Sequence, residues 1–168
     1  MSRTSLLATA GLALCAVAAA SPANDEKEIH ASACQPYTNS PIDPAALKVR
    51  ANGITNGYST SKYVICPVLK DREAGWVEAG AFPLNVWFRR QAGGADPKGN
   101  QCTLSFGSES YGPVKSITKN AMDAEIPNYA YAHFQEAMTN DTLFGGATLV
   151  CKLVPGNTLE YIYIDEQD

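Results

Sequence analysis

The two histidines are the side chains of this sequence best suited to proton transfer, because the ordinary pKa of imidazole lies near neutral pH. His30 stands beside a predicted first strand, and His133 follows Tyr129 and Tyr131 in an alternating segment. Neither histidine belongs to a motif typical of a catalytic base. We interpret both as structural residues, with His133 the stronger candidate for function.

The serines and carboxylates form no recognisable catalytic motif. Residues 107–112 superficially resemble a G-x-S-x-G nucleophile elbow, but the spacing differs and the preceding strand leads into a loop. We therefore interpret Ser108 and Ser110 as turn residues. Two carboxyl groups about 5–10 Å apart could hydrolyse a glycosidic bond. The acids available for such a pair are Glu109, Asp123, Glu125, Glu136 and Asp141.

The chain ends in an acidic tail formed by Asp165, Glu166 and Asp168. We interpret this tail as a solvated terminus, with weak calcium binding as the alternative because carboxylate oxygens suit that ion. The sequence contains no phosphate-binding glycine loop, dinucleotide fingerprint or helical calcium loop. We therefore predict no catalytic residue, no metal site and no cofactor, which favours a non-catalytic protein.

A tryptophan on a polar strand face favours a binding role. In the predicted strand 82–91, Trp87 alternates onto the same face as Asn85 and Arg89. An exposed aromatic ring flanked by polar groups can stack on a sugar or anchor a protein partner. The alternative is that a loop or the edge of another sheet covers it. The candidate ligand-binding residues are Trp87, Arg89, Asn85, Tyr131 and His133, with further aromatic candidates at Trp76, Tyr161 and Tyr163.

The N-terminus has the layout of a cleavable secretory signal. One positive charge, Arg3, precedes the apolar run Leu6–Ala20, and small residues follow it. Cleavage is expected after Ala20 or after Ala23. The run is shorter than the roughly 20 apolar residues that a membrane-spanning helix needs. We therefore predict a secreted or periplasmic protein with no membrane span after cleavage of residues 1–20.

Charge argues against nucleic acid as a partner. The chain has 13 basic and 17 acidic residues, a formal charge of −4, and removal of Arg3 with the signal leaves −5. Neutralisation of phosphates by basic residues supplies most non-specific nucleic-acid affinity. An acidic domain without a basic patch is therefore expected to bind an extracellular glycan or protein instead.

Four cysteines remain after signal cleavage: Cys34, Cys66, Cys102 and Cys151. An even number of cysteines in an oxidising compartment is typical of disulfides, and no pair has the C-x-x-C spacing of a zinc site. Three pairings are possible. We favour Cys34–Cys66 and Cys102–Cys151, because Cys102 and Cys151 both fall on the apolar sides of alternating strands.

The elements that must position these residues are mostly strands. Short apolar runs alternate with Gly, Pro and Asn turns, and no convincing amphipathic helix is present. Segment 128–138 could be a helix or a strand, and its alternation favours a strand. We predict an all-β fold with about eight strands, a single antiparallel β-sandwich of the jelly-roll or immunoglobulin-like type. Residues 21–28 are expected to form a flexible lead-in, and residues 29–168 the domain.

Several segments together resemble a group of small exported bacterial proteins. The segments are Ile29–Cys34, Gly53-Ile54, Tyr63-Val-Ile-Cys-Pro67, Cys102-Thr-Leu-Ser105, Leu149–Gly156 and Tyr161–Glu166. The resemblance covers most of the mature chain and implies a four-cysteine β-domain in an exported protein. That group has no assigned activity, so the resemblance implies no catalytic or binding residue.

Three hypotheses follow for function. The first is a secreted or envelope-associated non-catalytic binding module whose ligand is a glycan or a surface protein. The second is a small secreted hydrolase that uses a carboxylate pair or His133. The third is a structural protein of the cell envelope.

Overall fold

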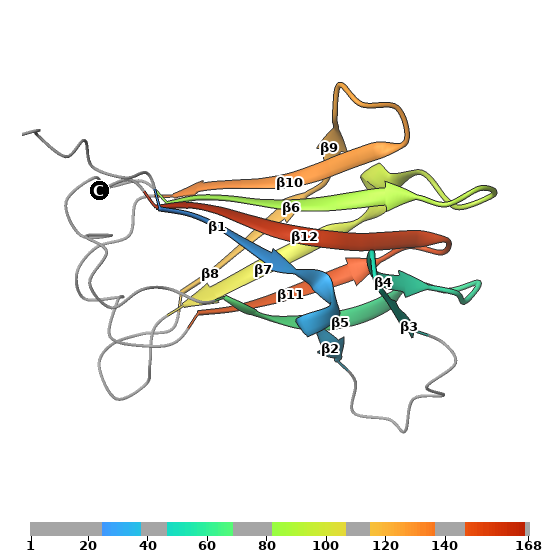
Figure 1. Cartoon of the computed structure of the whole chain (residues 1–168), viewed down its shortest axis with the longest axis horizontal. Coiled ribbons are helices and arrows are strands. Elements are labelled where there is room, and N and C mark those ends of the chain that lie inside the picture. The colour runs from blue at the N-terminus through green and yellow to red at the C-terminus, as the bar shows by residue number, and fades with distance from the viewer. Residues whose placement is uncertain (1–24, 38–46, 69–81, 107–114, 137–146, 167–168) are drawn as a thin grey trace, which may run out of the picture.

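Two antiparallel sheets pack face to face in a β-sandwich (Figure 1). The structure is a computed structural model, and it describes residues 25–37, 47–68, 82–106, 115–136 and 147–166. Trp76, Ser108, Glu109, Ser110, Asp141 and Asp168 lie outside these ranges. Among the described elements, no helix is long and apolar enough to cross a membrane. The all-β sandwich predicted from the sequence is thus confirmed.

The larger sheet has seven strands in the order β3-β4-β12-β6-β10-β9, with β1 pairing along the same edge of β12 as β4. The strand bounds are β1 Asp25–His30, β3 Leu47–Arg50, β4 Gly53–Asn56, β6 Phe82–Arg90, β9 Met122–Asp123, β10 Tyr129–Glu136 and β12 Asn157–Glu166. The smaller sheet has the order β2-β5-β11-β7-β8. Its strands are β2 Gln35–Pro36, β5 Lys62–Val68, β7 Gln101–Phe106, β8 Lys115–Asn120 and β11 Ala147–Leu153. Two 3₁₀ helices, η1 Ala31–Ala33 and η2 Pro97–Gly99, complete the described elements.

All eight expected strands are present, and four short strands of two to four residues were not anticipated: β2, β3, β4 and β9. Strands this short contain too few positions for an alternating pattern to be recognised. The ambiguous segment before Met138 is strand β10, as its alternation favoured.

The first strand corrects two predictions about the N-terminal region. Strand β1 begins at Asp25 and pairs with β12 up to His30, so the expected flexible lead-in over 21–28 is wrong from Asp25 onwards. The first strand, expected over Glu28–Cys34, also ends earlier, at His30, because residues 31–33 form η1. Segment 25–28 is charged and lacks an alternating pattern. Its conformation depends on backbone pairing with β12, which cannot be recognised from the local sequence. Charged side chains are common on such edge strands.

The C-terminal tail is also partly ordered. Asp165 and Glu166 belong to β12 and pair with Glu26 and Asp25 of β1. The backbone of these two residues is therefore part of the sheet, which their interpretation as a terminal tail did not anticipate. The same long-range pairing accounts for the order of both ends of the domain.

The core lies between the two sheets and follows the alternation of the strands. On β6 the inward residues Leu84, Val86 and Phe88 are fully buried. Their partners on β10 are Phe134, Ala132 and Ala130, so that the large Phe88 stands opposite the small Ala130. This matching of large and small side chains keeps the interior densely packed.

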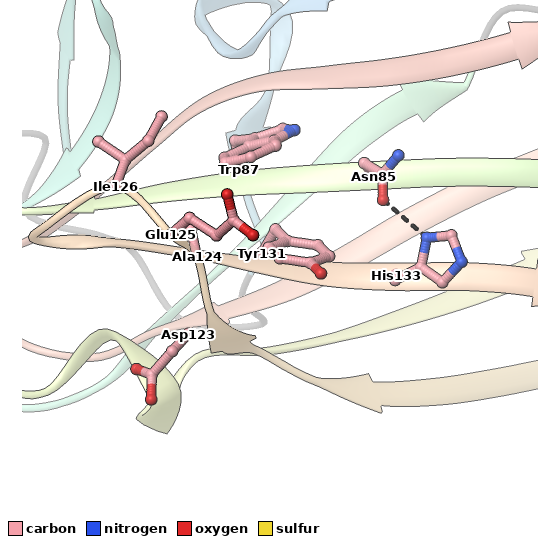
Figure 2. Close-up of a pocket in the computed structure, with 8 residues that line it drawn as sticks. All are labelled: Asn85, Trp87, Asp123, Ala124, Glu125, Ile126, Tyr131 and His133. Carbon is pink, nitrogen blue, oxygen red and sulfur yellow. Dashed lines mark hydrogen bonds between the residues drawn. The ribbon is translucent and has the colours of Figure 1, made fainter.

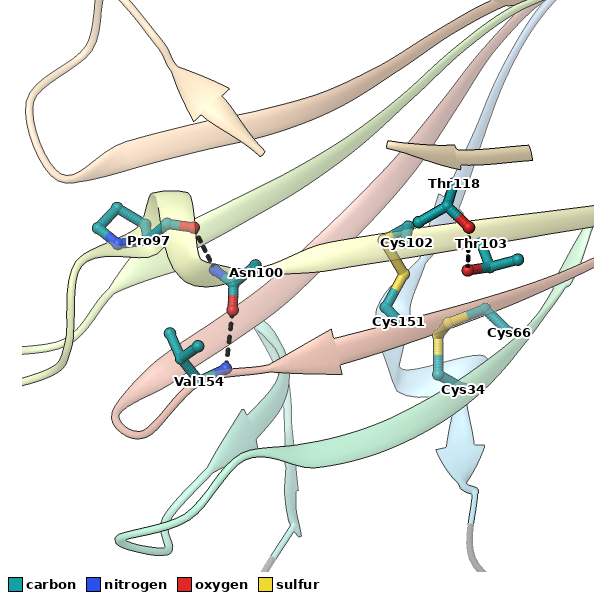
Figure 3. Close-up of a disulfide and its surroundings, with 9 residues drawn as sticks. All are labelled: Cys34, Cys66, Pro97, Asn100, Cys102, Thr103, Thr118, Cys151 and Val154. Atoms are coloured by element: carbon teal, nitrogen blue, oxygen red, sulfur yellow. Dashed lines mark hydrogen bonds between the residues drawn. A yellow bond between two sulfur atoms is a disulfide. The ribbon is translucent and has the colours of Figure 1, made fainter. Parts of the chain in front are cut away.

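Both disulfides join buried cysteines of the smaller sheet region (Figure 3). Cys102 and Cys151 are directly opposite each other on β7 and β11. Cys34, which follows η1, is bonded to Cys66 on β5. The pairing favoured from the sequence is therefore confirmed.

A fully buried set of asparagines fixes one end of the sandwich. Asn100 Nδ2 donates to the Pro97 carbonyl at 2.8 Å, and Asn100 Oδ1 accepts from the Val154 N–H at 2.9 Å (Figure 3). Asn100 Nδ2 also donates to Asn157 Oδ1 at 3.2 Å. Asn56 Nδ2 likewise donates to the Leu153 carbonyl at 2.8 Å. These amides form hydrogen bonds with backbone groups where the β11–β12 turn meets η2. Buried backbone N–H and C=O groups need such partners.

Replacing Asn100 by alanine is expected to lower the free energy of unfolding by about 1–3 kcal/mol, because the buried Val154 N–H loses its acceptor. Urea denaturation of the oxidised protein measures this loss. The matched control is Gln101→Ala, which removes an exposed 2.8 Å hydrogen bond to Asn120 and should change stability by less than about 0.5 kcal/mol. Equal effects of the two variants would contradict a structural role for the buried amide.

Candidate functional site

Three aromatic rings form a row on the outer face of the larger sheet. Strand alternation turns Trp87 away from the core, and the register places Tyr131 of β10 and Tyr161 of β12 directly beside it. The ring centroids of Trp87 and Tyr131 are 5.2 Å apart with an interplanar angle of 27°, and those of Trp87 and Tyr161 are 5.8 Å apart at 22°. We call Tyr131, Trp87 and Tyr161 the aromatic row.

A bulge in β12 places Tyr161 in this row. The pairing of β12 with β6 shifts register between Leu159 and Tyr161, so that Glu160 is the extra residue. Leu159 and Ile162 both point into the core, although three positions separate them. Without the shift, strand alternation would turn one of these two side chains toward solvent. The bulge therefore keeps both apolar residues inside and turns Tyr161 outward.

The row continues onto the outer strands of the sheet. Met122 of β9 pairs with Tyr131, and His30 of β1 pairs with Tyr161. Met122 is 46% exposed. A line of side chains from Met122 through the aromatic row to His30 therefore crosses five neighbouring strands, perpendicular to the strand direction. An extended ligand could contact several of these side chains at once.

The environment of Trp87 differs from both interpretations made from the sequence. It is neither an isolated exposed ring nor a ring covered by a loop, because a tyrosine stacks on each side of it and leaves it half-buried. Centroid separations above 5 Å at near-parallel orientation indicate offset stacking. Offset rings leave part of each face uncovered, so the aromatic row presents partial ring faces and edges to a ligand.

Polar groups border the aromatic row on one side. His133 Nδ1 donates to Asn85 Oδ1 over 2.7 Å, and His133 Nε2 lies 3.4 Å from Gln135 Oε1 (Figure 2). The Asn85 amide nitrogen and the imidazole edge therefore lie on the outer face next to Trp87 and Tyr131. They can contribute directional hydrogen bonds to a ligand on the rings.

On the other side of the row, Arg89 forms an ion pair with Glu160. Arg89 Nε lies 2.6 Å from Glu160 Oε1, and the side chain of Glu160 is only 14% exposed. This pairing occupies Arg89, which does not line the pocket described below. The structure thus places Arg89 beside the aromatic row and engages it with a residue of its own chain.

The two tyrosines near this ion pair keep their protons well above neutral pH. Burial raises the pKa of Tyr161 above its usual value, and the carboxylates of Glu28 and Glu160 raise it further. Burial also raises the pKa of Tyr129, with Glu160 adding to the effect and Arg89 opposing it. Both phenols are therefore hydrogen-bond donors as well as acceptors at neutral pH.

A pocket of about 490 Å³ opens beside the aromatic row (Figure 2). Its residues come from two outward-facing strands and from the turn between β9 and β10. They are Asn85, Trp87, Tyr131 and His133 from the strands, and Asp123, Ala124, Glu125 and Ile126 from β9 and the turn. Four of the five candidate residues identified from the sequence therefore line one pocket, and Arg89 does not.

The β9–β10 turn is the part of the site that sequence reasoning missed. Asp123 and Glu125 were considered as catalytic acids, and Ile126 was not singled out. Asn128 adopts φ 69° at the end of the turn, a left-handed conformation that asparagine tolerates. Proline and asparagine before an alternating strand are a turn signal, but such a signal does not show which strand face the turn borders.

One acid of the pocket, Asp123, is already engaged in an ion pair. Asp123 Oδ2 lies 3.2 Å from Lys98 Nζ, and both side chains are largely exposed. His133 is bonded to Asn85 as described. Within the described ranges, no group of three or more His, Cys, Asp or Glu residues could hold a metal ion.

Comparison with known proteins identifies the fold. No protein-family model matches the chain, and no curated protein matches it. Among solved structures, the xylan-binding module CBM15 superposes with a TM-score of 0.54 over 86% of this chain and 98% of that chain, at 8% sequence identity. TmCBM61 in complex with beta-1,4-galactotriose gives a TM-score of 0.33 at 12% identity, covering 84% of this chain and 85% of that chain. CBM28, a non-crystalline cellulose specific carbohydrate-binding module, gives 0.35 at 14% identity, covering 71% and 76%. At these identities the likeness to CBM15 is one of fold.

Proposed function

We propose that this chain is a non-catalytic carbohydrate-binding module that works outside the cytoplasm and binds a glycan on the aromatic row and its adjoining pocket. The observation that carries the proposal is the stack of Tyr131, Trp87 and Tyr161 across three strands, partly exposed and bordered by polar groups. A sugar ring has apolar C–H faces and a rim of hydroxyls. Aromatic surface with nearby hydrogen-bonding groups matches both features.

The polar groups of the site suit hydroxyl recognition. The amide of Asn85 and the imidazole of His133 can each exchange hydrogen bonds with sugar hydroxyls. The phenol of Tyr161 remains protonated, so it can donate as well as accept. A site with aromatic and polar groups on rigid neighbouring strands is also well ordered before binding, which reduces the entropic cost of association.

The sandwich fold and the two disulfides are consistent with the proposal, but neither is sufficient evidence for it. The chain shares its sandwich fold with a xylan-binding module, but one fold can host many unrelated functions. Two disulfides suit a protein that works in an oxidising compartment. Glycan binding is therefore inferred from the aromatic row itself.

A titration against soluble polysaccharides tests the proposal. The mature oxidised protein is expected to bind at least one member of a panel of xylan, mixed-linkage glucan, galactan, soluble cellulose derivatives and chitosan. Trp87→Ala is expected to weaken this binding by about thirtyfold or more, because removal of a central aromatic anchor typically costs 2 kcal/mol or more. Isothermal titration calorimetry or affinity electrophoresis provides the affinities.

Two further variants make this test specific. Trp87→Phe retains a ring between the tyrosines and should restore most of the affinity. Tyr63→Ala removes a 48% exposed ring from β5 of the smaller sheet and should leave binding unchanged. Binding to none of the polysaccharides, or undiminished binding by a folded Trp87→Ala protein, would contradict the proposed function.

A further inference from the structure

We propose that the glycan recognised by this chain bears protonated amines, as a polymer of 2-amino-2-deoxy sugars does, because Glu125 holds its carboxylate beside the rings of Trp87 and Tyr131 in a pocket whose lining also includes Asp123. This inference rests on the proposed function and narrows its ligand class.

The pocket is negatively charged. Its described lining includes two carboxylates and no lysine or arginine. Glu125 is exposed and has no ion-pair partner in the described part of the chain, and Figure 2 shows its carboxylate near Tyr131 and Trp87. Asp123 contacts Lys98 at 3.2 Å, but the two side chains are 69% and 50% exposed, and such a surface pair is weak.

Lys98 does not neutralise its surroundings. Its ammonium nitrogen lies 3.7 Å from Asp96 Oδ2 as well as 3.2 Å from Asp123 Oδ2. One positive charge therefore stands between two carboxylates, and the group as a whole is negative. With Glu125 added, this end of the aromatic row has a net negative charge.

The other end of the aromatic row has one further carboxylate, Glu28. Glu160 compensates the charge of Arg89 at 2.6 Å, and Glu28 of β1 pairs with the residue two positions beyond Tyr161 on β12. The carboxylates of Glu28 and Glu160 both contribute to raising the pKa of Tyr161. The positive charge of Lys48 is remote from Trp87, because Lys48 lies on β3, which is three strands from β6 in the sheet order. A ligand on the row therefore lies near the carboxylate of Glu125 at one end and that of Glu28 at the other.

This combination suits an alkylammonium group. An ammonium near an aromatic face is attracted by the ring quadrupole, and a carboxylate adds charge-assisted hydrogen bonds. A uronic acid polymer would be repelled by the same carboxylates, and a neutral polymer would gain only stacking and neutral hydrogen bonds. The expected order of affinity is therefore aminosugar polymer, then neutral polymer, then uronic acid polymer.

Three oligosaccharides of equal length test this order: a β-1,4-linked glucosamine pentamer, its fully N-acetylated form and a galacturonic acid pentamer. Calorimetry is performed at a pH above the ordinary carboxyl pKa of about 4 and below the pKa of the sugar amine. The glucosamine pentamer is expected to bind about tenfold more tightly than its N-acetylated form, a ratio equivalent to one cation–π or charge-assisted contact. The ratio should decrease as salt is added.

Charge-removing variants locate the effect. Glu125→Gln is expected to reduce the affinity ratio of the two glucosamine forms severalfold. Lys152→Gln changes the charge by one unit on β11 of the smaller sheet, outside the pocket lining, and should leave the ratio unchanged. A ratio near or below one in the native protein would overturn the inference.

Two other outcomes are distinguishable. If pentalysine displaces the glucosamine pentamer as effectively as free glucosamine pentamer does, the pocket recognises charge without the sugar, and the inference is wrong. If neutral pentamers bind in a Trp87-dependent manner while the glucosamine form has no advantage, the inference fails and the proposed function stands. If no pentamer binds and Trp87→Ala changes nothing, both fail.

Discussion

Replacing Cys102 and Cys151 together by alanine is expected to lower the free energy of unfolding by about 4 kcal/mol. The two cysteines are 49 residues apart in the chain, and the crosslink between them restricts the unfolded state most strongly when the closed loop is long. Both residues are fully buried between central strands β7 and β11. Urea denaturation monitored by tryptophan fluorescence measures the change, with stability obtained by linear extrapolation.

The Cys34→Ala/Cys66→Ala protein provides the comparison. Its loop spans 32 residues, so the entropic loss is expected to be slightly smaller. A loss of less than about 1 kcal/mol in either double variant would show that strand pairing alone already restricts the unfolded chain. Because typical domains are stable by only 5–15 kcal/mol, reduction of both bonds should remove most of the stability.

Replacing Phe88 by alanine is expected to destabilise the oxidised protein by about 3–5 kcal/mol. Phe88 is fully buried near the C-terminal end of β6, between Ala130 of β10 and Leu159 of β12. Because Ala130 is small, no neighbouring strand residue on that side can fill the space. Truncation therefore leaves a cavity in addition to the lost transfer energy.

Phe88→Leu is the graded control for this prediction, because it retains most of the apolar volume and should cost much less than Phe88→Ala. Tyr63→Ala, at an exposed position of the smaller sheet, should cost less than about 1 kcal/mol. Equal losses for Phe88→Ala and Phe88→Leu would mean that the aromatic shape, and not cavity formation, determines the stability at this position.

Phe88 and Trp87 are adjacent in sequence and serve opposite faces of β6. Phe88 packs in the core, and Trp87 belongs to the aromatic row. We therefore expect Trp87→Ala to alter glycan binding more than stability, and Phe88→Ala to alter stability first. The two variants therefore distinguish the contribution of the sheet to stability from its contribution to ligand binding.

Several features were predictable from the sequence because they are local. Alternation along β6 and β10 identified both strands and assigned the outward face to Asn85, Trp87 and His133. The even number of cysteines and their positions on apolar strand sides led to the observed disulfides. Such patterns arise because successive residues of a strand point to opposite faces. Buried apolar residues therefore occur at every second position.

Other features depended on partners far away in the chain. Strand β1 has a charged sequence and is ordered by pairing with β12, more than a hundred residues later. Strands β3 and β4 are short, and their extended conformation depends on pairing with the sheet that they extend. Local propensity is too weak to report such pairing, because the decisive hydrogen bonds connect residues that are distant in sequence.

The sequence by itself determined the fold class and the outward orientation of the candidate residues on β6 and β10, and it favoured the disulfide pairing that the structure shows. Only the tertiary structure decided that Tyr161 joins Trp87 and Tyr131, because a bulge and the register of β12 set that neighbour. It also decided that Arg89 pairs with Glu160 and that the β9–β10 turn brings Asp123 and Glu125 to the aromatic row. The physical reason is that alternation fixes which face a side chain occupies, whereas strand order and register, set by the packing of the whole domain, fix its neighbours.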